Sequence, residues 1–180
     1  LVRAGIGNIG LIDNDIVNLS NIHRQSLFTS KDIKKSKVSV AAKKLKEINP
    51  STKIKIYKSR LDRSNIRNII KNYEIIIDGS DNFKTKFLIN DYCKKFKKKL
   101  VTGAISKFDG HVFTFDFNDR KTASLKSFYQ ENEISDDDLN CEFEGVLGTT
   151  ASIVGTTQAN EALKMIVKIG QNLKNQILII

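Results

Sequence analysis

Acidic and basic side chains stand close together in residues 11–25, LIDNDIVNLSNIHRQ. A short apolar run ends at Asp13 and Asp15, and Arg24 follows after a polar loop. In α/β sheets, an acid at the carboxyl end of a strand is well placed to bind a ribose hydroxyl. An arginine can bind phosphate through a bidentate fork. The segment therefore predicts half of a nucleotide site. The alternative is a solvated strand end beside a surface arginine.

A second strand end carries acids in residues 75–82, IIIDGSDN. Asp78 and Asp81 follow a buried β-branched run, where two carboxylates are poised to hold Mg²⁺ beside phosphates. The alternative is that Ser80 caps the following helix and Asp81 complements the helix dipole.

Taken together, the two segments favour nucleotidyl transfer. Asp13 would bind ribose, Arg24 and Lys37 would bind phosphates, and an aspartate of the second segment would hold the metal. The set contains no hydrolytic nucleophile, and positively charged groups around phosphates are the main requirement of such transfers.

The glycine pattern GIGNIG, residues 5–10, matches a dinucleotide-binding fingerprint in letters only. That fingerprint must follow a strand and open a helix. Here the first five residues, LVRAG, are typical of a helix end closed by Gly5, and a strand follows. We therefore expect a helix exit and a turn, not a phosphate loop.

Strands and helices alternate along the chain. We expect strands at residues 9–12, 53–57, 74–78, 100–104, 111–117 and 177–180, and helices at 36–48, 65–72, 82–96 and 150–169. On the helix at 82–96 we expect Phe83, Phe87, Leu88, Tyr92 and Phe96 to face inward. This order predicts an α/β fold, Rossmann-like and doubly wound, with a mostly parallel sheet and an antiparallel extension.

Composition narrows the class of protein. The 180 residues suit one domain, 1–180, and both ends look truncated. The apolar runs fall far short of the roughly 20 residues of a membrane helix. Two cysteines, Cys93 and Cys141, predict reduced thiols in a cytoplasmic protein. The net charge of +10 comes from scattered lysines without tryptophan, so we read it as solvated surface and do not expect a nucleic-acid partner.

Five segments stand in one order: LIDNDIVNLSNIHRQ, KKSKVSVAAKKLKEINP, IIIDGSDNFKTKFLIND, LVTGAI with FDGHVFTF, and CEFEGVLGTTASIVGTTQANEALK. This ordered set, which covers essentially the whole chain, resembles the ThiF/MoeB/HesA family, the bacterial relatives of ubiquitin-activating enzymes. The resemblance implies MgATP-dependent adenylation of the C-terminal glycine of a ubiquitin-like sulfur-carrier protein, in thiamin or molybdopterin biosynthesis.

The family pattern carries over to single positions. It implies that Asp13 binds the ATP ribose, that Asn21, Arg24 and Gln25 line the phosphate site, that Lys37 contacts phosphates and that Asp81 holds Mg²⁺. It also implies a homodimer, in which an upstream arginine reaches across the interface. The family's Gly-rich ATP loop would lie before residue 1, so we expect the isolated fragment to be inactive.

Four positions depart from the family or leave its chemistry open. Cys141 stands where some members place a cysteine that bonds to the activated carrier, although Glu142 beside it would raise a thiol pKa. Ser124 and Ser127 stand where relatives carry a zinc-binding C-x-x-C pair, so we expect no zinc. Lys86 replaces a frequent arginine and cannot reproduce a bidentate fork.

Two other functions remain open from the sequence. The basic charge would suit a related adenylating enzyme that acts on tRNA. The missing Gly-rich loop and zinc cysteines would suit a non-catalytic module that binds a ubiquitin-like protein.

Overall fold

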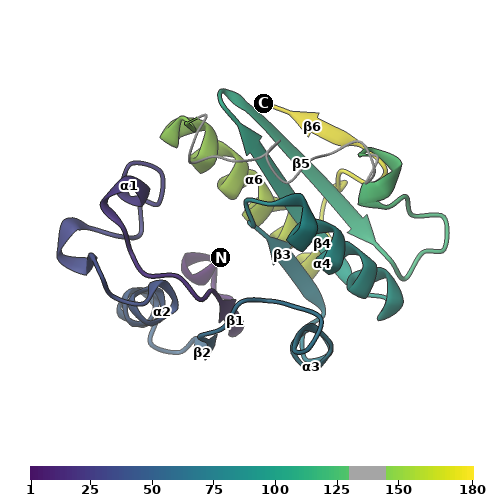
Figure 1. The fold of residues 1–180 in the computed structure, drawn as a ribbon. Coiled ribbons are helices and arrows are strands. Elements are labelled where there is room, and N and C mark those ends of the chain that lie inside the picture. Colours follow the sequence, from purple (N-terminus) through teal and green to yellow (C-terminus); the bar gives the residue numbers. More distant parts are fainter. Residues whose placement is uncertain (130–144) are drawn as a thin grey trace. The chain divides into compact units, whose positions relative to one another are not determined.

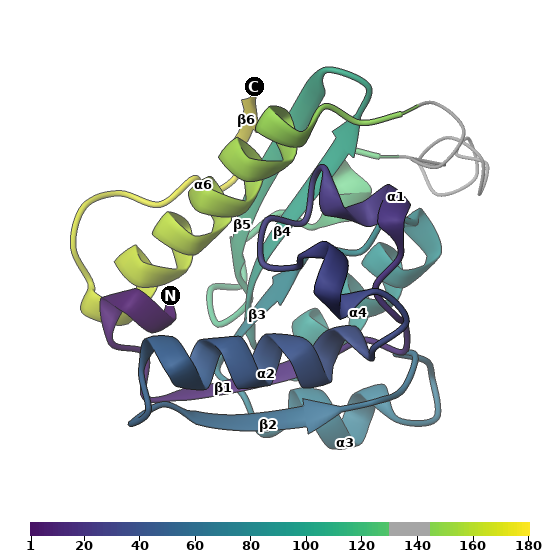
Figure 2. The same ribbon diagram turned by 90° about the vertical axis from the view of Figure 1, so that its left-hand side faces the viewer.

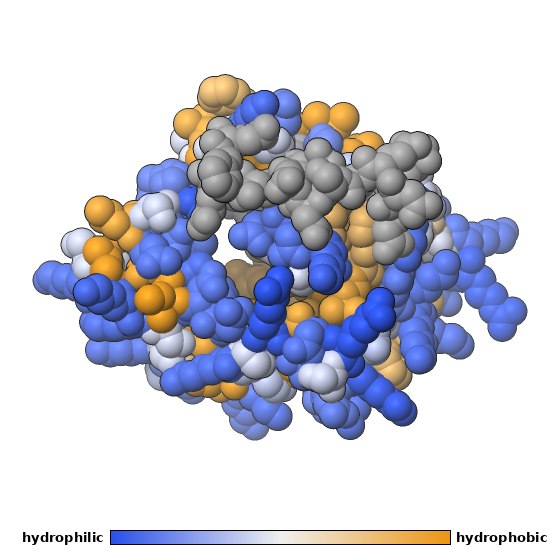
Figure 3. All heavy atoms as spheres, viewed as in Figure 1, coloured by the Kyte–Doolittle hydropathy of each residue, from blue (hydrophilic) through white to orange (hydrophobic). Residues whose placement is uncertain are grey.

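The computed structural model describes residues 1–129 and 145–180, and these form two compact units, Leu1–Leu61 and Asp62–Ile180. Each unit is an α/β assembly with its own strand pairing (Figure 1). In the part of the chain that the structure describes, no helix is both long and apolar enough to cross a membrane. Hydrophilic residues cover most of the face seen in Figure 3, in keeping with solvated lysines.

Unit 1 is built around two parallel strands and one long helix. Its elements are η1 (Val2–Ala4), β1 (Asn8–Ile12), α1 (Leu19–Ile22), η2 (Ser30–Asp32), α2 (Lys37–Ile48) and β2 (Lys53–Tyr57). Strands β1 and β2 pair in parallel from Asn8 opposite Lys53 to Ile12 opposite Tyr57. Helix α2 runs beside both strands in Figure 2. Parallel strands require such a crossover, so the strand ends that follow β1 and β2 lie at one edge.

The GIGNIG glycines lie where the sequence predicts. Gly5 closes η1 in the left-handed region with φ of 87°, a conformation that glycine adopts without steric cost. Strand β1 then follows and contains Gly10, which pairs with Lys55. The glycines thus precede a strand rather than open a helix, and they form no phosphate loop.

Unit 2 contains a four-stranded mixed sheet. Its elements are α3 (Ile66–Ile70), β3 (Ile75–Asp78), α4 (Phe83–Lys95), β4 (Lys99–Ser106), β5 (Asp109–Asp116), η3 (Leu125–Ser127), α6 (Gly148–Val167) and β6 (Ile177–Ile179). The strand order is β3-β4-β5-β6; β3 and β4 are parallel, and β5 and β6 extend the sheet antiparallel. The predicted α/β class, with a parallel core and an antiparallel extension, is confirmed.

Helices cover both faces of this sheet. Helix α6 packs on β4 and β5, and α4 lies on the opposite side (Figures 1 and 2). On β5, Thr114 donates a hydrogen bond to Glu161 of α6, whereas Phe113 packs on Phe128 and Tyr129 near η3. Alternate side chains of β5 therefore enter two different cores, which explains why both sets of its alternating pattern are buried.

Two glycines allow α6 to approach the β4–β5 hairpin closely. A Cβ atom added at Gly110 would lie 2.4 Å from a methyl carbon of Val154, and one added at Gly103 would lie 2.8 Å from both Val154 and Gln158. The close approach brings the amide of Gln158 under the strands, where it reaches main-chain oxygen atoms.

The buried face of α4 differs from the expected one. Leu88, Tyr92 and Phe96 are only half-buried, and the fully buried positions are Phe83, Lys86, Phe87, Ile89, Asn90 and Cys93. The aromatic pattern misplaced the face because buried polar partners orient this helix. Asn90 accepts a hydrogen bond from the main-chain nitrogen of Leu125 at 3.0 Å. Cys93 is fully buried, and burial raises the pKa of its thiol.

In unit 1, a buried aspartate fixes the turn before α2. Oδ2 of Asp32 accepts hydrogen bonds from Lys44 at 2.5 Å and from the main chain and hydroxyl of Thr29 at 2.9 Å each. These bonds, the one from Lys44 first, lower the pKa of Asp32 from 3.8 to about 2.

We predict that Asp32→Asn flattens the acid sensitivity of folding. Because the folded pKa lies below the unfolded one, the charged carboxylate stabilises the native state above about pH 4, and this contribution disappears as the pH falls towards 2. Urea unfolding at several pH values should show a steeper loss for the wild type than for Asp32→Asn, with the exposed Asp109→Asn as control. Parallel curves for the wild type and Asp32→Asn would contradict the assignment.

Candidate functional site

At the carboxyl end of β1, Asp13 organises a tight turn. Its Oδ1 accepts a hydrogen bond from the main-chain nitrogen of Asp15 at 2.8 Å. No hydrogen bond to the other carboxylate oxygen is found within the described residues, so that oxygen is available to a ribose hydroxyl.

Lys37 begins α2 and is paired with the same turn. Its Nζ lies 3.0 Å from Oδ2 of Asp15, and its main-chain nitrogen donates to the main-chain oxygen of Asp15, also at 3.0 Å. The lysine side chain is 10% exposed and the aspartate 57% exposed. Asp15, which the sequence analysis left without a role, therefore holds the ammonium group next to the strand end. Two of the three N–H donors of that ammonium group remain for a ligand.

The polar loop after β1 buries two amides. Asn21 lies in α1, and its main-chain oxygen accepts from the main-chain nitrogens of Arg24 at 3.1 Å and Gln25 at 2.9 Å. Oδ1 of Asn21 and Oε1 of Gln25 are buried and have no partner in unit 1. Buried polar atoms nearly always have partners, so these two mark a place for a polar ligand or water.

Arg24 uses little of its hydrogen-bonding capacity. Its Nη1 donates to the main-chain oxygen of Ser20 at 2.8 Å. Since a guanidinium carries five N–H donors, the group keeps most of its fork for an anion. Unit 1 thus brings Asp13, Asn21, Arg24, Gln25 and Lys37 to the segment that links β1 to α2.

In unit 2, the two acids that follow β3 have different environments. Asp78 is 2% exposed. Its Oδ1 accepts from the main-chain nitrogen and hydroxyl of Ser80 at 2.8 and 2.6 Å, and its Oδ2 accepts from Lys86 at 3.2 Å and Thr102 at 2.5 Å. A carboxylate offers about four lone-pair sites, so Asp78 is saturated and cannot also bind a metal.

Asp81, by contrast, is exposed. One hydrogen bond reaches its carboxylate from the described residues, from the side chain of Asn82 at 3.2 Å. Asn82 itself caps α4 by accepting from the main-chain nitrogen of Thr85 at 2.8 Å, so the idea that Ser80 caps this helix is wrong. Of the two acids considered for the metal, Asp81 keeps a free oxygen.

A single carboxylate fits Mg²⁺ that arrives with a nucleotide. Mg²⁺ keeps several waters and is usually bound through one or two carboxylates together with substrate phosphates. Among the described residues, no group of three or more histidine, cysteine, aspartate or glutamate side chains could hold a metal by itself. The exposed carboxylate of Asp81 therefore fits a metal that a nucleotide would bring with it.

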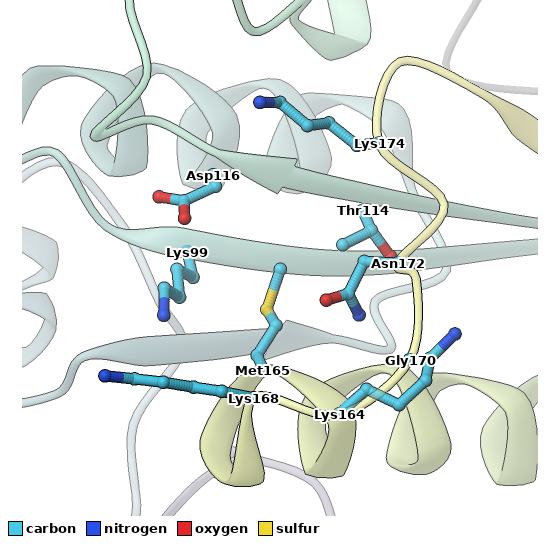
Figure 4. A pocket seen from close by; sticks show the side chains of 9 residues that line it. All are labelled: Lys99, Thr114, Asp116, Lys164, Met165, Lys168, Gly170, Asn172 and Lys174. Atoms are coloured by element: carbon cyan, nitrogen blue, oxygen red, sulfur yellow. The ribbon is translucent and has the colours of Figure 1, made fainter.

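A cavity of about 260 Å³ in unit 2 is lined by residues of β4, β5, α6 and the segment after α6 (Figure 4), and neither acid is among them. Its lining includes Lys99, at the amino end of β4, whereas Asp78 pairs with Thr102 further along that strand. Two of its lysines form ion pairs with acids of the same unit: Lys164 pairs with Glu161, and Lys174 pairs with Asp119. Ligands of parallel sheets bind at carboxyl ends of strands, so this cavity is not the predicted site.

Glu161, which lies in α6, has a structural role. Burial opposes its ionisation, but hydrogen bonds from Lys164, Asn172, Leu173 and Thr114 outweigh burial and lower its pKa. The group is therefore a charged anchor for the segment after α6.

Three remaining predicted positions lie near η3 or beyond the described residues. Ser124 precedes η3 and Ser127 ends it; the main-chain nitrogen of Ser124 donates to Oγ of Ser127 at 3.4 Å. Leu125, between them, is 1% exposed and anchors this segment. Cys141 lies outside the described residues.

Sequence reasoning missed the groups that hold Asp78. Thr102 and Gln158 received no role, and Lys86 was noted only as a departure from a family pattern. Gln158 donates to the main-chain oxygen of Asp78 at 2.7 Å. The available signal was a polar residue at each of three positions on faces of predicted strands and helices that otherwise carry apolar side chains.

Parallel strand pairs with acids at the carboxyl ends of their strands are typical of Rossmann-like α/β proteins. The sequence model of the ThiF family matches residues 1–180. The chain belongs to the ThiF family, as its resemblance predicted.

Curated relatives match along most of the chain. It is 43% identical to a probable molybdopterin-synthase adenylyltransferase from Porphyra purpurea, over 92% of the chain and 43% of the relative. It is 35% identical to the sulfur carrier protein adenylyltransferase of Thermus thermophilus, over 99% of the chain and 67% of the relative. It is 34% identical to the probable adenylyltransferase/sulfurtransferase MoeZ of Mycobacterium tuberculosis, over 99% of the chain and 46% of the relative. The chain spans about half the length of most of these relatives.

Solved structures share the fold. Escherichia coli MccB superposes with a TM-score of 0.86 at 19% identity, over 99% of this chain and 53% of that one. MccB solved with ATP gives a TM-score of 0.85 at 21% identity, over 99% of this chain and 54% of that one. At these identities the likeness establishes the fold.

We predict that substitutions of the two acids of unit 2 differ greatly in their effect on stability. Asp78→Asn would leave the Lys86 ammonium buried without its counter-charge, which costs about 3–5 kcal/mol. Asp81→Asn changes an exposed side chain and should stay within about 0.5 kcal/mol. Urea unfolding of both variants measures the contrast; equal losses would contradict the different environments described here.

Proposed function

We propose that the complete protein adenylates the C-terminal carboxylate of a ubiquitin-like sulfur-carrier protein with MgATP, in molybdopterin or thiamin biosynthesis. The observation that carries the proposal is a sequence match along nearly the whole chain to relatives named adenylyltransferases, one of them a sulfur carrier protein adenylyltransferase. The contrast between Asp78 and Asp81 supports it, since it leaves one acid free for the metal of MgATP.

In this proposal, unit 1 handles the nucleotide. The free carboxylate oxygen of Asp13 would accept a hydrogen bond from a ribose hydroxyl. The amides of Asn21 and Gln25 gain the partners that unit 1 does not supply. The oxygen and the nitrogen of a side-chain amide occupy nearly the same shape. Rotation about the last side-chain bond therefore exchanges them and turns the N–H group towards phosphate.

Arg24 and Lys37 would stabilise the charge that develops during the transfer. An oxygen of the carrier's terminal carboxylate attacks the α-phosphorus of ATP and forms the acyl-adenylate bond. The bond between the α-phosphorus and the bridging oxygen breaks, and pyrophosphate leaves with that electron pair. Fixed positive groups are worth most where charge develops. The metal, when bound with ATP, would neutralise phosphate charge beside Asp81.

Asp15 would keep Lys37 in place without removing it from the reaction. The pair is 3.0 Å long, but the aspartate is more than half exposed, so water weakens the attraction. A phosphate can therefore bind the Lys37 ammonium group together with Asp15, at little cost in free energy.

Several finer points belong to the same proposal. The family resemblance also implies that Asp81 binds Mg²⁺, that the protein is a homodimer and that it lies in the cytoplasm. A covalent bond between Cys141 and the activated carrier is a further possibility that the same resemblance raises.

We predict that the complete protein catalyses ATP–pyrophosphate exchange that depends on a Gly-Gly-ended carrier, and that Asp81→Asn lowers the exchange rate by about 100-fold or more, because the free carboxylate is lost. Asp109→Asn, an equal change at another exposed aspartate, should leave the rate unchanged. Exchange that persists in Asp81→Asn would contradict the proposal that Asp81 binds the metal. Absence of exchange by the wild type with every such carrier would favour a module that binds without turnover.

A further inference from the structure

Three elements of unit 2 converge on one residue, Asp78, at the end of β3. Lys86 comes from the first turn of α4, Thr102 from β4 and Gln158 from α6. They hold Asp78 through its carboxylate, at 3.2 and 2.5 Å, and through its main-chain oxygen, at 2.7 Å. Lys86 also donates to the main-chain oxygen of Gly103.

This cluster is completely buried. The side chains of Asp78 and Lys86 are each 1% exposed. Taking two charges out of water is costly, and well-packed apolar residues are often as stable or more stable in such places. Stability alone therefore gives no reason to bury this pair. The best-attested use of buried ionic groups is to select one conformation among several.

The conformation that the cluster selects is that of residues 79–82. Oδ1 of Asp78 accepts both the main-chain nitrogen and the hydroxyl of Ser80, which fixes the chain as it leaves the strand. Asn82 is fixed in turn by its cap on α4, where it accepts from Thr85. Asp81 lies between these two anchored residues, and its own carboxylate is exposed.

We propose that Asp78 and Lys86, together with Thr102 and Gln158, are positioning residues that hold the 79–82 loop so that the exposed Asp81 carboxylate meets the metal of MgATP. The inference rests on the proposed function, because it gives Asp81 its metal role. Asp78 and Lys86 touch neither metal nor nucleotide in it. They act through the backbone of Ser80 and through α4, which carries the Asn82 cap.

Thr102 offers the cleanest test, because its hydroxyl can be removed without changing the charge pair. Thr102→Val keeps the side-chain volume and removes the donor 2.5 Å from Asp78, whereas Thr102→Ser keeps the donor. Thr114→Val is a matched control. It removes an equally buried threonine hydroxyl from the neighbouring strand, where the partner is Glu161.

The experiment measures the Mg²⁺ concentration for half-maximal ATP–pyrophosphate exchange in the complete protein. Partners of metal-binding groups typically control metal affinity by 10- to 100-fold. We expect about a 10-fold rise for Thr102→Val, with a much smaller change in the rate at saturating Mg²⁺. Thr102→Ser and Thr114→Val should stay close to the wild type. A half-saturation equal in Thr102→Val and Thr114→Val would overturn the inference.

A second measurement separates this inference from the proposed function. Mn²⁺ binding in the presence of ATP, followed by electron paramagnetic resonance, needs no turnover. Weaker Mn²⁺ binding by Thr102→Val but not by Thr102→Ser supports the inference even if the wild type shows no exchange, an outcome that would reject the proposed function alone. Unaltered Mn²⁺ binding by Thr102→Val, or no Mn²⁺ binding by the wild type, would overturn the inference.

Discussion

The buried ion pair between Asp78 and Lys86 is the constraint on which the organisation of unit 2 depends. It joins the end of β3 to α4, and the hydrogen bond to Gly103 extends it to β4. Once buried, each charge requires the other, because the loss of one partner leaves an uncompensated charge in a medium of low polarity. The strand end, the first turn of α4 and the α6 amide must therefore adopt one arrangement together.

Unit 1 uses the same construction in a more exposed form. There, too, an acid at the carboxyl end of a parallel strand pairs with a lysine in the first turn of a helix, Asp15 with Lys37 of α2 at 3.0 Å. The two pairs differ in their exposure to solvent: the side chain of Asp15 is 57% exposed, whereas the side chain of Asp78 is 1% exposed. An exposed pair is weak and can share its cation with a phosphate, while a buried, saturated pair cannot. The same pairing thus serves a ligand in one unit and the backbone in the other.

The sequence predicted the elements well, since strands, helices and their stops have strong local signals. The 53–57 strand and the glycine turn before β1 are examples. It predicted the face of α4 only in part, because Lys86 and Asn90 are buried by partners on other elements, Asp78 of β3 and Leu125 of η3. It also could not distinguish Asp78 from Asp81. Both are aspartates after one strand, and the difference comes from Thr102 and Gln158, which reach the site only through folding.

A structure of the complete protein with ATP and Mn²⁺ tests the central claim most directly. The account predicts a metal peak at coordination distance from the Asp81 carboxylate, about 2.1 Å for an ion of the size of Mg²⁺, with the Asp78–Lys86 pair intact. A metal bound to Asp78, with Lys86 displaced from it, would contradict the account.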